Sequence, residues 1–308
     1  DTKSQSTLAG WNTGKEVTYK GSEATYHAYL SEDGKNAWIY LVETSNKTKS
    51  LKFPDAVEGV VVTRVGYDTA LRKLEDADEF NQNISGVTVE YAHGVDGWGK
   101  KTMNVESVVL PKNLTKLEST ALSGFRKVKS ITIPDGVKEI SAETFYGCES
   151  LKEVKLPKSL AFFDNYTSFS ACPKLSKVTL SKANKNFKLQ KGLLLNKKGT
   201  KLIWAVPAKN KITVPDSVTS IADNALKAGK ATSVYLGKKV KIIGKDAIAG
   251  KKITKVSISK KNKRMGKQGQ CIYEKKSGKL LIAVAKKNVV KIGNKVKLIS
   301  EDASLCGS

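Results

Sequence analysis

The chain has 308 residues, of which 40% are hydrophobic, and a formal net charge of +25 at pH 7. Its apolar runs are far shorter than the roughly 20 residues that a membrane-spanning helix needs, so we expect no membrane insertion. Residues 1–100 hold 11 basic and 15 acidic side chains, whereas residues 181–300 hold 31 basic and four acidic ones. Only four of the 54 basic residues are arginine, although the guanidinium fork is favoured for recognising bases and phosphates. We therefore expect no nucleic-acid partner. The lysines suit an anionic glycan, a wall polymer or a lipid surface better, and plain solvation of a repeat protein fits them best.

Residues 1–47 precede the repeated part of the sequence. The chain starts at Asp1 without a Met or an apolar leader, which indicates that a signal was removed or that the numbering begins inside a longer gene product. Between residues 24 and 43, apolar and polar residues alternate around Asp33-Gly34, a pattern that predicts a two-residue β-hairpin. We expect this hairpin to cap the open edge of the first coil.

One line of sequence then recurs, an apolar pair that proline commonly follows. It starts at Val108, Ile131, Val154, Val178, Ile212, Val234, Val256 and Val290, in steps of 22 to 24 residues apart from two steps of 34. The alternation of apolar and polar residues predicts a short, half-buried strand, which proline ends because it has no N–H to donate. A single coil buries too few apolar side chains to fold alone, so the coils must stack.

Two coils are longer than the others, at about 181–211 and 259–289. Residues 178–230 align with 256–308 at a constant offset of 78 without a gap, which places Asn184 over Asn262. The chain therefore contains a duplicated higher-order unit. Its last coil stops without the strand that should follow, which predicts that the native polypeptide continues or ends in another kind of cap.

Residues 72–104 interrupt the pattern between the first and second coils with an acidic, helix-compatible stretch and a loop. Loops of this length are often functional. Tyr91 and Trp98 lie in this inserted loop, and we count both as candidate binding residues because aromatic faces bind sugars and peptides.

The segment ITIPDGVKEISAETFYGCESLKEVKLP, residues 131–157, resembles the repeat of BspA-like bacterial surface proteins, a subclass of leucine-rich repeats. The matching positions are Ile140, Phe145, Cys148, Leu151, Val154, Leu156 and Pro157. The resemblance covers about 48–308 and implies an α/β fold, a right-handed leucine-rich-repeat solenoid with a short-stranded parallel sheet on its concave face and irregular turns on its convex face. It also implies export, display on a bacterial surface, and adhesion or binding of host proteins.

Groups suited to catalysis or metal binding are scarce. His27 and His93 have no nucleophile motif beside them, so we interpret both as polar surface residues and expect no enzyme activity. The absence of a C-x-x-C pair disfavours a zinc site, and the acidic stretch at 76–79 lacks the pattern of a calcium loop. The sequence predicts no metal and no cofactor.

The four cysteines leave two interpretations open. Cys148 and Cys172 occupy the same place in consecutive coils, so a disulfide is sterically possible. Buried free thiols are favoured, because both side chains should point inward in parallel. Cys271 and Cys306 could pair across the last coils.

Outward positions of the predicted sheet form two rows of hydroxyl and lysine side chains. The candidate binding residues in these rows are Lys155, Lys177, Lys211, Tyr235, Lys255 and Lys291. They suit weak, multivalent capture of an acidic or hydroxylated polymer, or they only keep the sheet soluble.

We predict a non-enzymatic, monomeric protein, extracellular or on the cell surface, that binds a host extracellular protein or a glycan, with an anionic polymer as a further partner. One alternative is a structural spacer or stalk held to anionic cell-wall polymer. The other is the non-catalytic part of a larger surface enzyme. The predicted organisation is an N-terminal segment, 1–47, followed by the solenoid, 48–308.

Overall fold

The computed structural model describes residues 8–44, 47–66, 104–119, 121–123, 125–250 and 252–307. Tyr91, Trp98 and His93, with nearly all of the inserted segment predicted at 72–104, lie outside these residues. The chain divides into two compact units. Unit 1 comprises residues 1–174 and 179–184, and unit 2 comprises 175–178 and 185–308. The boundary that the sequence suggested at residue 47 remains a prediction.

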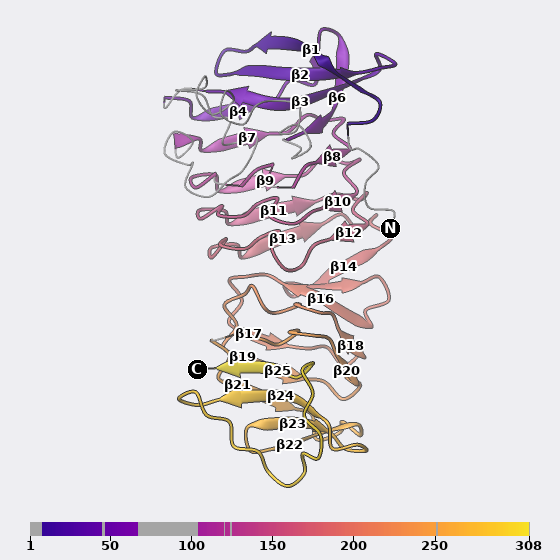
Figure 1. The fold of residues 1–308 in the computed structure, drawn as a ribbon, viewed down its shortest axis with the longest axis vertical. Helices are drawn as coiled ribbons and strands as arrows, with labels where there is room; N and C mark the ends of the chain where they lie inside the picture. Colours follow the sequence, from indigo (N-terminus) through magenta and orange to yellow (C-terminus); the bar gives the residue numbers. More distant parts are fainter. Residues whose placement is uncertain are drawn as a thin grey trace. The chain divides into compact units, whose positions relative to one another are not determined.

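Apart from Asn104, which has a 3₁₀ conformation, the regular elements in the described ranges are β-strands, and the chain is a solenoid of β-repeats (Figure 1). The α/β class expected from the family resemblance is therefore wrong for this part of the chain. After its strands, a coil closes through tight turns, such as the bonds from Thr144 N to Ser141 O, 3.4 Å, and from Cys148 N to Phe145 O, 3.2 Å. Glu143 lies within the first of these turns with a left-handed φ of 58°, which interrupts any right-handed helix.

Each coil begins with a short first strand whose inward residue is the apolar residue that marks the repeat. The first strands are β4 (Ser50–Lys52), β7 (Ser107–Val109), β9 (Ser130–Thr132), β11 (Glu153–Leu156), β13 (Lys177–Leu180), β17 (Lys211–Thr213), β19 (Ser233–Leu236) and β21 (Lys255–Ile258). They pair in parallel, with Val154 beside Ile131 in unit 1 and with Ile212, Val234 and Val256 in one row in unit 2. The predicted repeat register is confirmed at these rungs.

A second row of parallel strands lies across the coil from the first strands. In unit 1 these strands are β8 (Lys116–Leu117), β10 (Glu139–Ile140) and β12 (Phe162–Phe163), and in unit 2 they are β18 (Ser220–Ile221) and β20 (Ile242–Ile243). Sequence reasoning placed only irregular turns here, and that expectation is wrong. Each second strand has two residues, too few to show an alternating pattern, so a lone buried isoleucine such as Ile140 or Ile221 is its only signal.

The N-terminal segment forms an antiparallel sheet of β1 (Trp11–Lys20), β2 (Thr25–Ser31) and β3 (Asn36–Glu43). The β2–β3 hairpin turns around Asp33-Gly34, as predicted, but its loop has the four residues 32–35 instead of the predicted two, with Gly34 at a φ of 71°. Strand β3 pairs in parallel with β6 (Val60–Val65), which also pairs with the short β5 (Ala56–Val57) and with β8. Within unit 1, the N-terminal sheet therefore joins the repeated coils through the second strand β8.

A buried arginine holds this junction together. Arg64 on β6 is only 3% exposed, and its guanidinium carbon lies 3.6 Å from the ring centre of Trp38 on β3. Its Nε donates a hydrogen bond to Glu118 Oε1 at 2.6 Å. The charge is thus paired and stacked on an aromatic face, which offsets the cost of burying it.

The two long coils contain antiparallel meanders. The first consists of β14 (Phe187–Gln190), β15 (Leu193–Asn196) and β16 (Lys201–Ala205), and the second of β22 (Met265–Gln268), β23 (Cys271–Glu274) and β24 (Leu280–Ala285). Their last strands continue in parallel, β16 with β18 and β24 with β25 (Ser304–Gly307). The predicted duplication at an offset of 78 therefore appears in the structure as two copies of one meander.

The copies diverge after β24. The sequence predicts a first strand at Val290, but Lys286 and Val289 instead close a tight turn, with hydrogen bonds of 2.9 and 3.0 Å between their backbones. Lys287 and Asn288 within this turn have left-handed φ values of 50° and 61°. This turn redirects the chain away from β21, so the strand expected at Val290 does not form.

A buried asparagine marks the start of each meander. Asn262, 2% exposed, donates from Nδ2 to Gly237 O at 2.9 Å and to Val240 O at 3.0 Å, and its Oδ1 accepts from the backbone N–H groups of Arg264 and Met265, both at 2.9 Å. Asn184 likewise donates to two carbonyl groups of the preceding coil. The alignment paired the two asparagines without indicating this role.

Candidate binding surface

The exposed side chains of β17, β19 and β21 form a surface that we name the strand face of unit 2. It consists of two rows in register, Lys211, Ser233 and Lys255 in one and Thr213, Tyr235 and Ser257 in the other. Neighbouring strands lie about 4.8 Å apart, and Lys211 and Lys255 are two strands apart. The backbone positions that carry these two lysines are therefore about 10 Å from each other. Tyr235 is 39% exposed between the lysine-bearing strands.

The structure brings together three of the predicted binding residues and separates the others. Lys211, Tyr235 and Lys255 share the strand face of unit 2, whereas Lys155 is exposed on β11 in unit 1. Lys177 opens β13, at the chain boundary between the units. The sequence also placed Lys291 in a first strand, but it lies in the loop after β24. Whether any of these residues binds a partner remains a prediction.

A hollow of about 700 Å³ lies at the carboxyl ends of β17, β19 and β21. Tyr235 lines it, with Lys238, Lys260 and Lys261 around it. The only carboxylate in the lining is that of Asp216, which accepts a hydrogen bond from the Lys238 backbone N–H at 3.4 Å. The aromatic ring of the strand face is therefore surrounded mainly by cations.

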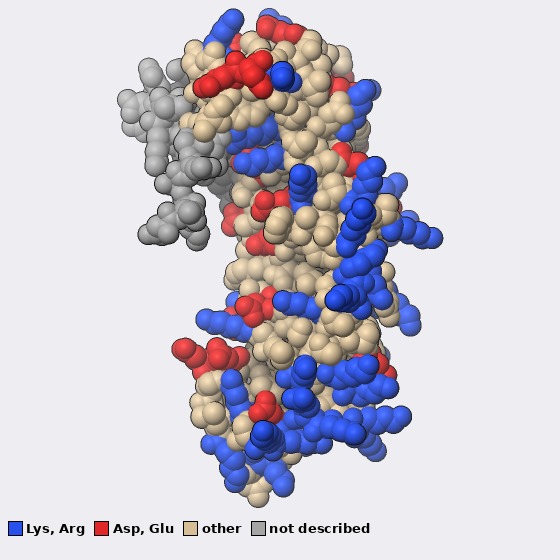
Figure 2. Space-filling view, turned by 90° about the vertical axis from the view of Figure 1, so that its right-hand side faces the viewer, with Lys and Arg blue, Asp and Glu red and all other residues tan. Residues whose placement is uncertain are grey.

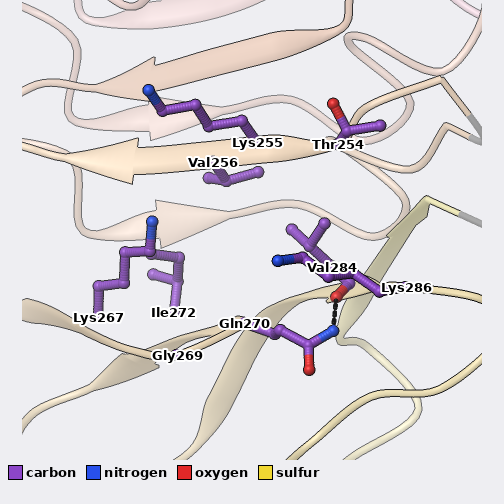
Figure 3. A pocket seen from close by; sticks show the side chains of 9 residues that line it. All are labelled: Thr254, Lys255, Val256, Lys267, Gly269, Gln270, Ile272, Val284 and Lys286. Atoms are coloured by element: carbon purple, nitrogen blue, oxygen red, sulfur yellow. Dashed lines mark hydrogen bonds between the residues drawn. The ribbon is translucent and has the colours of Figure 1, made fainter.

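A second hollow, of about 430 Å³, lies at the start of β21 (Figure 3). We name it the β21 pocket. Its lining consists of Thr254, Lys255, Val256, Lys267, Gly269, Gln270, Ile272, Val284 and Lys286. It contains three lysines and no acidic residue, so it is the more strongly basic of the two hollows. Sequence reasoning found only Lys255 among these residues, because the pocket depends on how the chain turns after β24.

Unit 1 offers a different surface. Its hollow of about 680 Å³ beside β7 and β9 is lined by both acids and bases, Glu106 and Asp135 with Lys112 and Lys129, and by Val109, which is 50% exposed. Mixed charge gives this surface no preference for an anion or a cation.

The two units differ in net charge, because the excess of basic residues lies entirely in unit 2. Unit 2 has 31 lysine or arginine residues and six acidic ones, whereas unit 1 has 23 of each. Figure 2 shows the side of the molecule that carries the second strands, where basic side chains crowd the surface of unit 2 and acids and bases mix on unit 1. Since charges act over a Debye length of about 8 Å in physiological salt, unit 2 attracts anions from several directions.

His27 is not the surface residue that the sequence suggested. Its side chain is 15% exposed between two carboxylates of the N-terminal sheet: Nδ1 contacts Glu16 on β1, and Nε2 forms an ion pair at 3.2 Å with Glu43 on β3. Burial alone would lower the pKa of His27, but the hydrogen bonds and charges of the two carboxylates outweigh burial and raise the pKa. Tyr40 also donates to Glu16. The cluster links three strands and lines neither basic hollow.

All four cysteines are free and buried. The Cys148 thiol donates to Leu122 O at 3.2 Å, and the Cys172 thiol donates to Phe145 O at 3.0 Å, each one coil back. The contact with Cys172, and then burial, raise the pKa of Cys148 well above its ordinary value. These thiols form part of the core, which disfavours chemistry on them.

Within the ranges that the structure describes, no three His, Cys, Asp or Glu side chains are grouped so that they could hold a metal ion. The same residues include no helix with the length and hydropathy to cross a membrane.

Comparison with solved structures returned bacterial proteins at low identity. They include a leucine-rich repeat protein from Eubacterium ventriosum (17% identity, 79% of this chain and 68% of that chain, TM-score 0.43) and the pneumococcal vaccine antigen PcpA (16%, 80% and 72%, TM-score 0.42). A leucine-rich cell surface protein from Faecalibacterium prausnitzii is 14% identical over 80% of this chain and 77% of that chain, with a TM-score of 0.37. A search of curated proteins found no match.

The family model for the BspA type leucine-rich repeat region matches in six copies, over residues 100–194 and 204–296. These ranges hold most of the first and second strands and the whole second meander, whereas the gap between them falls within the first meander, across the end of β15 and the start of β16. The chain belongs to the BspA-type leucine-rich repeat family, a repeat family that is typically non-catalytic.

Proposed function

We propose that the chain is the binding region of an exported bacterial surface protein, and that it attaches through the strand face of unit 2 to an extracellular host glycan or host protein that carries acidic groups. The observation that carries this proposal is the joint placement of Lys211, Tyr235 and Lys255 on one rigid sheet. Membership of the BspA-type family supports the surface location.

The strand face suits repeated, weak contacts better than a single tight one. Its cations recur on alternate strands, so a polymer with regularly spaced anionic groups can contact several of them at once. Tyr235 adds an aromatic face, on which a sugar ring or an apolar side chain can pack. Outward side chains also vary without disturbing the core, because the inward residues alone hold the coils together.

The experiment measures binding to immobilised host matrix proteins and glycans at low and physiological salt. The test variant is Lys211→Ser with Tyr235→Ser, because serine is the residue that the same two rows carry at Ser233 and Ser257. Lys276→Ser is the control, since it removes one exposed positive charge from a turn of the second meander. We expect the test variant to lose at least tenfold in affinity for the bound partner and the control to lose less than twofold. Equal losses in both variants would contradict a role for the strand face.

One observation favours a second function, attachment to anionic cell-wall polymer as a spacer or stalk. Basic side chains also cover the side of unit 2 that carries the second strands (Figure 2), and a diffuse positive coat needs no single binding face. This function predicts binding to every polyanion tested, uniform loss at high salt and equal effects of the two variants.

A further inference from the structure

We infer that the β21 pocket is a binding site for an acidic sugar, and that it holds the sulfate or carboxylate group of the sugar between Lys267 and Lys286. This inference names a ligand class for the basic unit and rests on the proposed function only in taking the ligand to be an extracellular glycan. Lys255 belongs to both the strand face and the pocket, but Lys267 and Lys286 are distinct from Lys211 and Tyr235, so variants at these two pairs let the two proposals fail separately.

The pocket exists because the second meander departs from the first. In the first copy, the Ala208 backbone N–H donates to Leu175 O at 3.0 Å, which ties the chain after β16 to the coil beside it. The equivalent residue in the second copy, Lys286, donates instead to Val289 O within its tight turn. The tie to the start of β21 is therefore absent, and a hollow of about 430 Å³ lies in its place.

Gln270 fixes the wall of the pocket. Its Nε2 donates to Val284 O at 2.6 Å and to Val289 O at 3.2 Å, and its Oε1 accepts from the Lys291 backbone N–H at 3.0 Å. The equivalent residue in the first copy is Gly192, which has no side chain to make these bonds. The turn after β24 is thus held open by a side chain that only the second copy has, and the site is formed before a ligand arrives.

Two of the three pocket lysines are also specific to the second copy. Lys267 and Lys286 stand where the first copy has Leu189 and Ala208. Figure 3 shows both side chains directed toward the space below Val256. Two ammonium groups that face one hollow with no carboxylate in its lining repel each other, and an anion between them removes that repulsion.

The chemistry of the lining favours an acidic sugar over a bare ion. Val256 and Ile272 provide an apolar inner wall against which a pyranose ring can pack, and the Thr254 hydroxyl can exchange hydrogen bonds with sugar hydroxyls. Lysine binds an anion as a point charge and does not impose the bidentate geometry of arginine. A sulfate and a carboxylate both fit this requirement, and the pocket volume lies within the range of about 300 to 1,000 Å³ that small-molecule sites occupy.

The experiment titrates the full chain with four probes and follows binding by calorimetry. The probes are a sulfated disaccharide, an unsulfated uronic-acid disaccharide, a neutral disaccharide of the same linkage and inorganic sulfate. The test variant is Lys267→Leu with Lys286→Ala, which installs the side chains of the first copy. Lys198→Ala with Lys276→Ala is the control, because it removes the same charge from turns of the two meanders outside the pocket.

We expect one or both acidic disaccharides to bind, the neutral one not to bind, and the test variant to weaken binding at least tenfold while the control changes it less than twofold. The preferred acidic probe distinguishes sulfate from carboxylate as the group that is held. Binding of sulfate alone, equal binding of the neutral disaccharide, or equal losses in both variants would overturn the inference. Preference for a glycerol-phosphate oligomer, run as an added arm, would also overturn it.

The two proposals separate by variant. If the strand-face variant loses the partner while the pocket variant binds every probe like the wild-type chain, the proposed function stands and the inference is wrong. If the pocket variant alone loses binding, the inference stands and the strand face is not the attachment surface. The far-ultraviolet circular dichroism of each variant shows that it is folded.

Discussion

Replacement of Asn262 tests how the meander is attached to the coil beside it. Four hydrogen bonds connect this side chain to the backbone, two to carbonyl groups of the preceding coil and two from the N–H groups of Arg264, just before β22, and Met265, its first residue. At a net of about 0.5 to 1.5 kcal/mol for each bond, Asn262→Leu should lower the free energy of unfolding by about 2 to 6 kcal/mol. The upper half of that range is expected, because the buried carbonyl and N–H groups are left without partners.

Urea unfolding followed by circular dichroism measures this loss, with Asn210→Ser, at an exposed position in the same unit, as the control. Asn262→Asp discriminates further. Its carboxylate keeps the acceptor role toward the two N–H groups but faces two carbonyl oxygens, so it should be less stable at neutral pH than at pH 4. A cost below about 0.5 kcal/mol for Asn262→Leu, the level of an ordinary surface substitution, would refute this account of the attachment.

Three further outcomes follow from the buried polar groups. Arg64→Met should cost about 3 to 5 kcal/mol in urea unfolding because it leaves the Glu118 carboxylate buried without its main partner, and the further change Glu118→Leu should recover much of that loss. Because the folded-state pKa of His27 is raised, its ion pairs stabilise the N-terminal sheet fully below the unfolded pKa of about 6.5 and weaken as the pH rises through the folded value. The protection factors of the β2 amides, which are corrected for the intrinsic pH dependence of exchange, should therefore fall as the pH rises above about 6.5 in the wild-type chain and change less in His27→Gln. The thiols of Cys148 and Cys172 should not react with a thiol reagent at pH 8 in the folded chain and should react fully in denaturant; fast native labelling would show that this part of the core opens.

The first strands could be predicted from the sequence because one physical rule produces them. A half-buried strand alternates inward and outward residues, and stacked coils require the inward residue at every repeat, so Ile131 and Val154 mark their rungs without any knowledge of the neighbours. The same rule fails at Val290. The residue types around Val290 match the repeat, but the turn at Lys287 and Asn288 changes the path of the chain before this position. The alternation of apolar and polar residues does not predict that turn.

The candidate site was predicted in part for the same reason. The strand face follows from the alternation alone, which is why Lys211, Tyr235 and Lys255 were found together. The β21 pocket depends on Gln270 and Lys286. Both residues line the pocket beside β21 because of the path that the chain takes after β24, which the repeat pattern does not predict. The signal that could have identified them was present in the alignment of the two copies, as the exchange of Gly192 for Gln270 and of Ala208 for Lys286 at equivalent positions.

The second copy illustrates how a repeat protein can gain a site that the repeat itself cannot supply. Coils in strict register bury their inner surfaces against each other. The β21 pocket lies instead at a place where one coil fails to follow the last. Here the place is the edge of β21, and the missing strand would leave backbone groups open to pairing with other chains. Lysines on such an edge discourage that pairing, and Lys255 on β21 is suited to this role. Edge protection does not account for Lys267, which projects from the meander and lines the hollow from the other side. A ligand explains the positions of Lys267 and Lys286, the two pocket lysines that the first copy lacks, which is why the proposed site depends on them.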